Sequence, residues 1–199
     1  MARQLKVSRD EGVEAALMAF WQHGYGALGT RQLEAETGIT RFTLQTAHGG
    51  KMALYAKALD RYLDRMEAEL IPAMADGTLE TLARWFEMRA DPSRMPEGAC
   101  WGCMMIAAIN EFGGSEPEIN ARAARFQEML RNGFGGALSR IGQVGGLARD
   151  VNIPAAVEVL MAASIGLNVI VRGAGDCSAG AETGAGIARL VRGWALPAQ

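Results

Sequence analysis

Apolar residues recur every three or four positions along most of the chain, which is the period of an α-helix with one buried face. The first such stretch follows Ser8, and its residues Val13 and Phe20 share one face. Ser8 and Glu11 have the spacing of a capping box, and Gly24 ends the stretch. Further helices are expected at residues 30–37, 40–46, 51–70, 78–90, 101–112, 117–141, 154–171 and 181–194. The pattern predicts an all-α protein of about nine helices with no convincing strand.

The second and third predicted helices are short and are separated by a glycine, as in a helix-turn-helix. Leu33 gives the first of the pair an inward-facing apolar residue, and Gly38 then breaks it. A turn that joins two helices at a steep angle needs one residue with positive φ, which costs other residues roughly 1 kcal/mol or more. Ile39 would anchor the turn in the core of the head, and Thr40 would cap the next helix. The alternative is two surface helices that happen to meet at a glycine.

The helix after this turn has polar side chains on its outer face. Leu44 and Ala47 can face inward with Ile39, which leaves the other side chains in solvent. In a major groove, arginine pairs with guanine or phosphate, glutamine with adenine, and threonine with either. The outward side chains are Arg41, Thr43, Gln45, Thr46 and His48. They form the candidate surface for reading DNA.

A long helix begins at Lys51 and is expected to stop at Pro72 and Gly77. A helix of about 20 residues is about 30 Å long, so it can connect a head to a body as a single lever. We therefore divide the chain into a helix-turn-helix head, residues 1–50, and a helical body for ligand binding and dimerisation, residues 51–199.

The segment Pro154 to Val171 is apolar nearly all round, which implies burial on more than one side. Within one body it meets a single layer, so the second face most simply meets another copy of the chain. We expect it to form a four-helix homodimer interface with the segment Ala181 to Trp194. The small residues Ala163, Gly166, Gly180 and Gly184 would allow close approach there.

The overall charge does not indicate a nucleic-acid partner, because the net charge of the 199 residues is −2 and the pI is about 5.8. The basic residues of the first quarter supply a local positive edge instead. These are Arg3, Lys6, Arg9, Arg31, Arg41 and Lys51. The polar N-terminus lacks the apolar core of a signal peptide, and the least polar run, residues 155–171, is too short to span a bilayer. We expect a cytoplasmic protein without a membrane partner.

Three cysteines, an odd number, favour reduced thiols over a disulfide framework. Cys100 and Cys103 have the spacing of a redox pair or half a zinc site, but zinc needs four ligands and Cys177 stands alone in the sequence. Packed thiols are the favoured interpretation, with a redox-sensing pair as the alternative. His23 would cap the first helix. No grouping typical of catalysis, a metal or a cofactor is visible, so we do not expect an enzyme.

The N-terminal residues resemble the DNA-binding domain of TetR/AcrR-type transcriptional regulators over about residues 8 to 62. The residues that carry the resemblance are Phe20, Gly24, Tyr25, Leu33, Gly38, Ile39, Thr40, Leu44, Gly49, Gly50, Lys51, Leu54 and Tyr55. Farther along, only the layout of a helical body with a dimerising helix pair is similar. The sequence departs from the pattern at Glu34, where a small residue is common, and at His48, where an aromatic is usual.

The resemblance implies a dimeric regulator, usually a repressor, that binds a pseudo-palindromic double-stranded DNA operator and releases it when a small-molecule inducer enters the body. By position, Thr40, Arg41, Thr43, Gln45 and Thr46 would lie on or at the start of the recognition helix. Lys51 would meet a phosphate together with the N–H groups at the start of its helix.

Aromatic and methionine side chains of the body are more often ordinary core, yet they also line adaptable apolar cavities. We expect several of them to surround a pocket for an apolar or aromatic inducer. The candidates are Trp85, Phe86, Met88, Trp101, Met104, Met105, Phe126 and Met129. The competing interpretation is a helical ligand-binding or scaffold dimer that has lost DNA binding, in line with the acidic pI, Glu34 and His48.

Overall fold

The computed structural model describes residues 8–75, 78–94 and 98–196, and every regular element within these ranges is helical. The elements are α1 (Arg9–His23), α2 (Thr30–Thr37), α3 (Arg41–Thr43), η1 (Leu44–His48), α4 (Lys51–Ala75), α5 (Leu79–Met88), η2 (Ala99–Trp101), α6 (Met104–Phe112), α7 (Pro117–Gln143), α8 (Ile153–Ala174), η3 (Cys177–Gly180) and α9 (Ala181–Arg192). The prediction of an all-α protein of about nine helices is confirmed for the residues that the structure describes. An isolated bridge between Leu147 and Ala195 adds a β contact.

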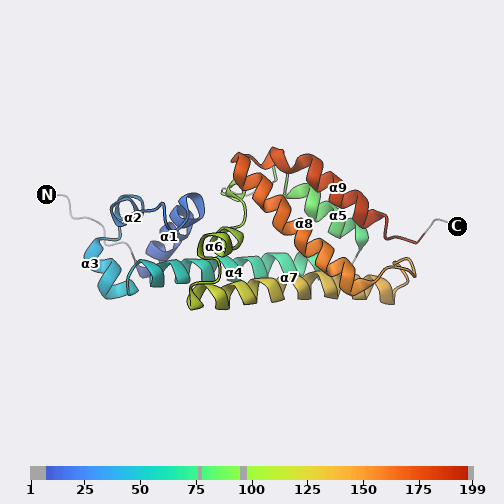
Figure 1. Ribbon diagram of the computed structural model, residues 1–199, viewed down its shortest axis with the longest axis horizontal. Helices are drawn as coiled ribbons and strands as arrows, with labels where there is room; N and C mark the ends of the chain where they lie inside the picture. The colour runs from blue at the N-terminus through green and yellow to red at the C-terminus, as the bar shows by residue number, and fades with distance from the viewer. Residues whose placement is uncertain (1–7, 76–77, 95–97, 197–199) are drawn as a thin grey trace.

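The first four elements form a head at one end of an elongated molecule (Figure 1). The capping box predicted for α1 is present, because the Ser8 side chain accepts from the Glu11 N–H and the Glu11 side chain accepts from the Ser8 N–H. The predicted core of the head is also confirmed. Its residues Phe20, Leu33, Ile39 and Leu44 are at most 4% exposed.

Helix α4 runs from the head into the body and lies beside α7 over much of its length (Figure 1). Arginines hold it on both sides. Arg61 of α4 pairs with Asp10 of α1 at 3.1 Å, and Arg122 of α7 pairs with Asp60 of α4 at 2.6 Å. Arg122 also donates to the Ala56 carbonyl, and its side chain is only 16% exposed. Apolar packing and this better-buried pair therefore fix α4 between the head and α7.

Helices α5, α8 and α9 lie together in the body, and α5 and α9 lie at the end away from the head (Figure 1). Trp85 and Phe86 of α5 pack with Phe134 of α7, with ring centroids 4.8 to 6.1 Å apart. Arg192 of α9 pairs with Glu87 of α5 at 2.7 Å. The core of the body is thus aromatic at its centre, and an ion pair connects α5 and α9.

Two predicted helix boundaries are wrong. Helix α4 continues through Pro72 to Ala75, because a proline in the last turn removes a single hydrogen bond of the helix. Gly77 lies outside the described residues. The helix expected from Trp101 begins at Met104, because the chain first makes the tighter turn η2 and then passes through Gly102 with positive φ.

The prediction that all three cysteines are packed or free thiols is also wrong. Cys100 in η2 and Cys177 in η3 form a disulfide across a sequence separation of 77 residues. Cys103 is free and buried, so the pair suggested by the Cys-x-x-Cys spacing does not form. The fold brings the turn before α6 and the turn after α8 together, a contact that sequence spacing does not reveal.

Helix α8 leaves an apolar face open to solvent. Its side chains Val159, Ile165, Val169 and Ile170 are 37 to 47% exposed. By length and composition α8 could cross a membrane, and 33% of its most apolar window is buried. Core helices of soluble proteins meet the same criterion, so this is weak evidence for a membrane span.

Two of the four small residues expected between subunits serve packing within the chain instead. A Cβ added to Gly180 would lie 2.7 Å from Leu167 Cδ1, and one added to Gly184 would lie 2.8 Å from the Phe86 carbonyl oxygen. Gly166 has nothing within 4 Å and Ala163 is partly buried, so these two stay compatible with a subunit contact.

Candidate nucleic-acid interface

The turn between α2 and α3 is fixed by hydrogen bonds that its own residues supply. Gly38 ends α2 in the left-handed conformation, with φ of 70°, and its N–H donates to the Glu34 carbonyl at 2.9 Å. The buried Thr37 hydroxyl donates to the Leu33 carbonyl and accepts from the Ile39 N–H. Because one small buried side chain satisfies groups on both sides of the turn, the angle between the two helices is held firmly.

The recognition segment, Arg41–His48, begins as the predicted helix and then widens. Thr40 caps it by accepting from the Thr43 N–H at 3.1 Å. After Thr43 the backbone becomes the π-helical turn η1, and Gly49 ends the segment with a positive φ. A wider turn advances each residue by a smaller angle than an α-helix does. The last side chains of the segment therefore face a different direction from the one that a regular helix predicts.

The outer face of the segment presents four of the side chains that could reach DNA. Arg41, Gln45 and Thr46 are exposed, as predicted. Phe42, which the sequence analysis missed, is 77% exposed beside them. An aromatic ring held in water at this position has an apolar surface that suits the methyl group of thymine. Its place two residues before the inward-facing Leu44, on the opposite side of a helix, was the sequence signal that could have identified it.

The two remaining threonines of the prediction are half-buried. The Thr40 and Thr43 hydroxyls lie 3.0 Å apart and hydrogen bond to one another. They therefore stabilise the start of the segment, and a phosphate contact would have to share these hydroxyls. Arg31 is exposed in the first turn of α2, the helix that packs against α3.

The prediction that His48 belongs to the DNA-reading surface is wrong. His48 is 3% exposed, and its ring lies next to Gly12 of α1. His48 lies four residues after the buried Leu44 and so on the same inner side of the segment, where its imidazole takes the place of the aromatic ring that is usual in the resembled pattern. Its Nδ1 has no hydrogen-bond partner in the structure. Glu34 is exposed, so neither departure from the family pattern disturbs the packing of the head.

Lys51 is directed toward the head as well as toward solvent. Its ammonium group donates to the Tyr25 carbonyl and lies 4.1 Å from the centre of the Tyr25 ring. Burial lowers the pKa of Lys51. The phosphate contact expected of Lys51 would therefore compete with an existing contact to the loop between α1 and α2.

Two basic residues that were not selected from the sequence as base- or phosphate-contacting candidates lie at the end of the recognition segment. Arg9 donates to the Ala47 carbonyl at 2.6 Å, and Lys57 donates to the His48 carbonyl at 3.0 Å. Cations at the last carbonyls of a helical segment are stabilising. Arg9 is also exposed, so it adds positive charge next to the reading face. Arg3 and Lys6 lie outside the described residues.

Three contacts connect the head to the body near α6. The Glu111 carboxylate at the end of α6 accepts from the backbone N–H groups of Tyr25 and Gly26. Trp21 of α1 donates from its indole nitrogen to the Gly102 carbonyl at 2.7 Å. Arg172 of α8 donates to the Trp21 carbonyl at 3.1 Å. The direction in which the recognition segment points is therefore set by the body as well as by α4.

Most of the eight residues predicted to surround an inducer are packed into the core of the part of the chain that the structure describes. Phe86, Met104, Met105, Phe126 and Met129 are buried core residues. Trp85 belongs to the cluster with Phe86 and Phe134, whereas Trp101 packs on Trp21, with ring centroids 5.8 Å apart. Six of the predicted side chains thus contribute to one hydrophobic core, and Trp101 packs on the head instead.

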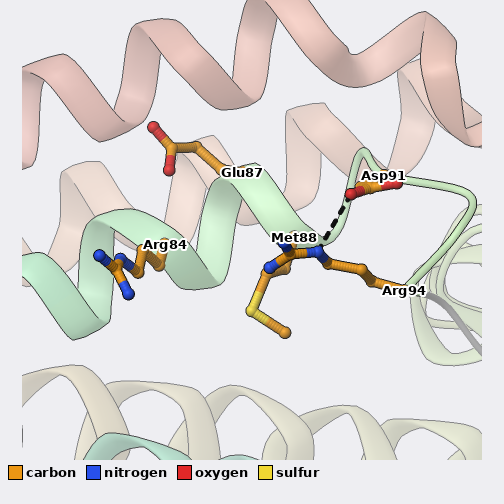
Figure 2. Close-up of a pocket in the computed structure, with 5 residues that line it drawn as sticks. All are labelled: Arg84, Glu87, Met88, Asp91 and Arg94. Carbon is orange, nitrogen blue, oxygen red and sulfur yellow. Dashed lines mark ion pairs between the residues drawn. The ribbon is translucent and has the colours of Figure 1, made fainter.

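A pocket of about 430 Å³ opens instead at the end of α5 and the loop that follows it. It is lined by Arg84, Glu87, Met88, Asp91 and Arg94, and Figure 2 shows their side chains. Met88 is the single predicted ligand residue among them. Arg94 pairs with Asp91 at 3.3 Å and Arg84 with Glu80 at 2.8 Å. The pocket is therefore polar, with acidic and basic groups at its rim.

Comparison with solved structures identifies the architecture. The chain superposes on a TetR-family transcriptional regulator from Cytophaga hutchinsonii with a TM-score of 0.81 and 15% identity, covering 98% of this chain and 100% of that one. It also superposes on a cysteine-substituted CifR, a TetR-family regulator bound to 26-bp double-stranded operator DNA, with a TM-score of 0.73 and 19% identity over 97% and 100% of the two chains. The chain is thus a helix-turn-helix protein with the TetR fold.

Sequence relatives agree with this architecture, although no protein-family model matches the chain. The chain is 39% identical over 61 residues to the HTH-type transcriptional repressor ComR of Escherichia coli, a match that covers 31% of the chain and 29% of the length of ComR. It is 26% identical over 164 residues to the uncharacterized HTH-type transcriptional regulator YezE of Bacillus subtilis, covering 81% and 84% of the two proteins. The chain therefore has the fold of TetR-family transcriptional regulators, and a stretch of 61 residues is similar to part of a helix-turn-helix repressor.

The burial of His48 predicts that acid destabilises the head. Burial, then the nearby charges of Lys57 and Arg9, lower the pKa of His48. The unfolded chain therefore takes up this proton first, and stability falls as the pH drops below the unfolded pKa of about 6.5. We expect the melting temperature to fall as the pH is lowered from 7 to 5. The His48→Phe variant should lack the part of this decrease that comes from protonation of His48.

The matched control is His23→Gln, because His23 is partly exposed and lies 3.2 Å from Glu36 on the surface. This variant should keep the acid sensitivity that depends on His48. Differential scanning fluorimetry across the pH range measures both variants. Identical pH profiles for wild type and His48→Phe would contradict the prediction.

Proposed function

We propose that the protein is a dimeric regulator that binds a pseudo-palindromic DNA operator through the recognition segment and acts as a repressor released by a small molecule. The observation that carries the proposal is the outward face of Arg41, Phe42, Gln45 and Thr46 on a segment whose inner side is locked into the head. Side chains of these types recognise base edges and phosphates. The repressor activity in the name of ComR and the operator DNA bound to CifR support the same proposal.

The competing interpretation, a dimer that no longer binds DNA, loses its two specific arguments. Glu34 is exposed and His48 fills a core position, so both residues are compatible with an intact head. The acidic pI describes the whole chain. Two acidic residues of α1, Asp10 and Glu14, are neutralised by arginines of α4 on the side of the head next to that helix. Local charge at the reading face, not net charge, decides affinity for DNA.

Operator binding tests the proposal directly. The purified chain should select related, two-fold symmetric sequences from random DNA, with half-sites roughly 34 Å apart or a multiple of that distance. Arg41→Ala should weaken binding to the selected operator by about 1–3 kcal/mol, and Phe42→Ala by about 1 kcal/mol with reduced preference for thymine. Lys51→Ala should weaken binding regardless of sequence.

The control is Arg149→Ala, because Arg149 is exposed in the turn between α7 and α8, far along the chain from the head. It removes one positive charge without touching the recognition segment. Fluorescence anisotropy at several salt concentrations measures affinity, and a steep salt dependence reports phosphate contacts. A chain that selects no sequence and shows no salt dependence would refute operator binding.

A second copy of the chain is the proposed cover for the exposed apolar face of α8. Val159, Gly166, Val169 and Ile170 form a stripe on this face, and Leu190 of α9 is 46% exposed. A two-fold axis would bring the α8 and α9 helices of both subunits together as a four-helix interface. The arrangement also supplies the symmetric pair of heads that a palindromic operator requires.

Charge placed in this stripe should break the dimer. Val169→Glu would bury a carboxylate against an apolar partner surface, which weakens association by on the order of 3 kcal/mol. We expect a monomer by light scattering at micromolar concentration. Val144→Glu is the matched control because Val144 is 83% exposed at the end of α7. A monomeric wild type, or a dimeric Val169→Glu variant, would contradict the proposed interface.

We further propose that the inducer binds in the pocket at the end of α5. Its volume of about 430 Å³ suits a small molecule, and its lining requires a ligand with a charged or polar group as well as an apolar part. Arg84 and Arg94 would attract an anionic group. Met88 would contact the apolar part. This revises the expectation of a purely apolar inducer.

Aromatic carboxylates are the probes that this lining suggests. We expect some of them to raise the melting temperature of the wild type and to weaken operator binding, since a ligand shifts the protein only as far as it prefers one state. Arg94→Ala should lose both effects, whereas Arg131→Ala, which changes an exposed arginine on α7, should keep them. If no aromatic carboxylate produced either effect, the proposed pocket would be rejected.

A further inference from the structure

The disulfide between Cys100 and Cys177 lies at the junction that connects the head with the body. Cys100 is half-buried in η2, and Cys177 is fully buried in η3, between α8 and α9. The bond ties the turn that precedes α6 to the turn between the two helices of the proposed dimer interface. Reduction or formation of this bond would therefore change how firmly these two turns are held together.

The residues next to Cys100 contact the head directly. The Trp101 ring packs edge-to-face on Trp21 of α1, and the Gly102 carbonyl accepts from the Trp21 indole nitrogen. Arg172 of α8 donates to the carbonyls of both Trp101 and Trp21. A Cβ on Gly102 would lie 2.7 Å from the Asn168 carbonyl oxygen, so this segment lies directly on the α8 backbone. A change at Cys100 therefore acts on a junction of α1, η2 and α8.

The cellular setting makes the bond reversible rather than permanent. An operator lies in the cytoplasm, where thiol systems keep most cysteines reduced, and disulfides found there are usually transient and redox-sensing. Cys103 does not take part in the bond, because its thiol is free and buried. The reacting pair is therefore Cys100 with Cys177.

We propose that Cys100 and Cys177 are a redox switch for operator binding, reduced when the protein binds DNA and oxidised by hydroperoxides when it is released. The inference rests on the proposed function, because a repressor has to bind in its resting, reduced state. Oxidation forms the bond seen in the structure and fixes η2, and with it Trp21 of the head, against the end of α8.

The chemistry balances with a hydroperoxide as the oxidant. The Cys100 thiolate, which is the more accessible of the two sulfurs, attacks the peroxide oxygen; the O–O bond breaks, and a sulfenic acid and an alcohol or water result. The Cys177 thiolate then attacks the Cys100 sulfur, the S–O bond breaks, and hydroxide leaves and takes a proton to become water as the S–S bond forms. Two thiols are oxidised and one peroxide is reduced. A cellular dithiol reverses the reaction by thiol–disulfide exchange.

The test compares operator affinity of the full chain in both redox states. Wild type reduced with dithiothreitol is divided, one part is oxidised with hydrogen peroxide, and excess peroxide is removed with catalase. Thiol counting should give three thiols before oxidation and one afterwards, as the sequence and the structure require. Tryptic mapping should then link residues 95–122 to residues 173–189. We expect operator affinity to fall at least tenfold on oxidation and to recover with dithiothreitol.

Three cysteine variants separate the switch from a general effect of peroxide. Cys100→Ser and Cys177→Ala should bind DNA like the reduced wild type and should not respond to peroxide. Cys103→Ala is the matched control, because this thiol lies in the same segment but outside the bond. It should respond as the wild type does. Cys100→Ser changes a half-buried residue, so it keeps the test decisive if Cys177→Ala does not fold.

The outcomes distinguish the switch from the function on which it rests. Equal, measurable affinity of the reduced and oxidised wild type, with the bond shown by thiol counting, would overturn the switch and leave operator binding intact. A peroxide response that persists in Cys100→Ser would also overturn it. No binding to any selected DNA in either state would overturn the proposed function, and the switch with it.

Discussion

The structure depends on α4 being packed on two sides at once. Its apolar residues Leu54, Tyr55, Leu59 and Leu63 are at most 1% exposed, because α1 covers one side of the helix and α7 covers another. A helix of 25 residues is stable mainly through such packing rather than through its own hydrogen bonds. Since the same rigid element contributes to the head and to the body, neither can move without changing its contacts with α4.

The head is held by contacts with several parts of the body, in addition to its attachment through α4. Glu111, Gly102 and Arg172 come from α6, from the turn before it and from α8, and each contacts the loop or the end of α1. The head is therefore positioned by four elements that are distant in sequence. Energetic coupling between a body site and the recognition segment has a physical route through these contacts, because each is a directional hydrogen bond with one preferred geometry.

The sequence predicts the head well because its signals are local. Capping by Ser8, the break at Gly38 and capping by Thr40 each depend on residues within four positions, and all three are present in the structure. His48 shows where local reasoning stops. Helical spacing puts it on the same side as Leu44, but its polar ring argued for the surface, and only the contact with α1 shows that it fills a core position.

The features that were missed in the body depend on contacts between distant residues. The Cys100–Cys177 bond joins residues 77 positions apart, and an argument from an odd number of cysteines has no means of finding such a pair. The polar pocket lies beside α5 because charged side chains converge there in space, whereas the apolar residues that seemed to form a pocket are needed to fill the core. Composition predicts which side chains are buried, but the shape of the space between them follows only from how the helices pack. The proposed ligand pocket and redox pair therefore depend on how distant parts of the chain pack, while the proposed DNA-reading face depends largely on one short segment.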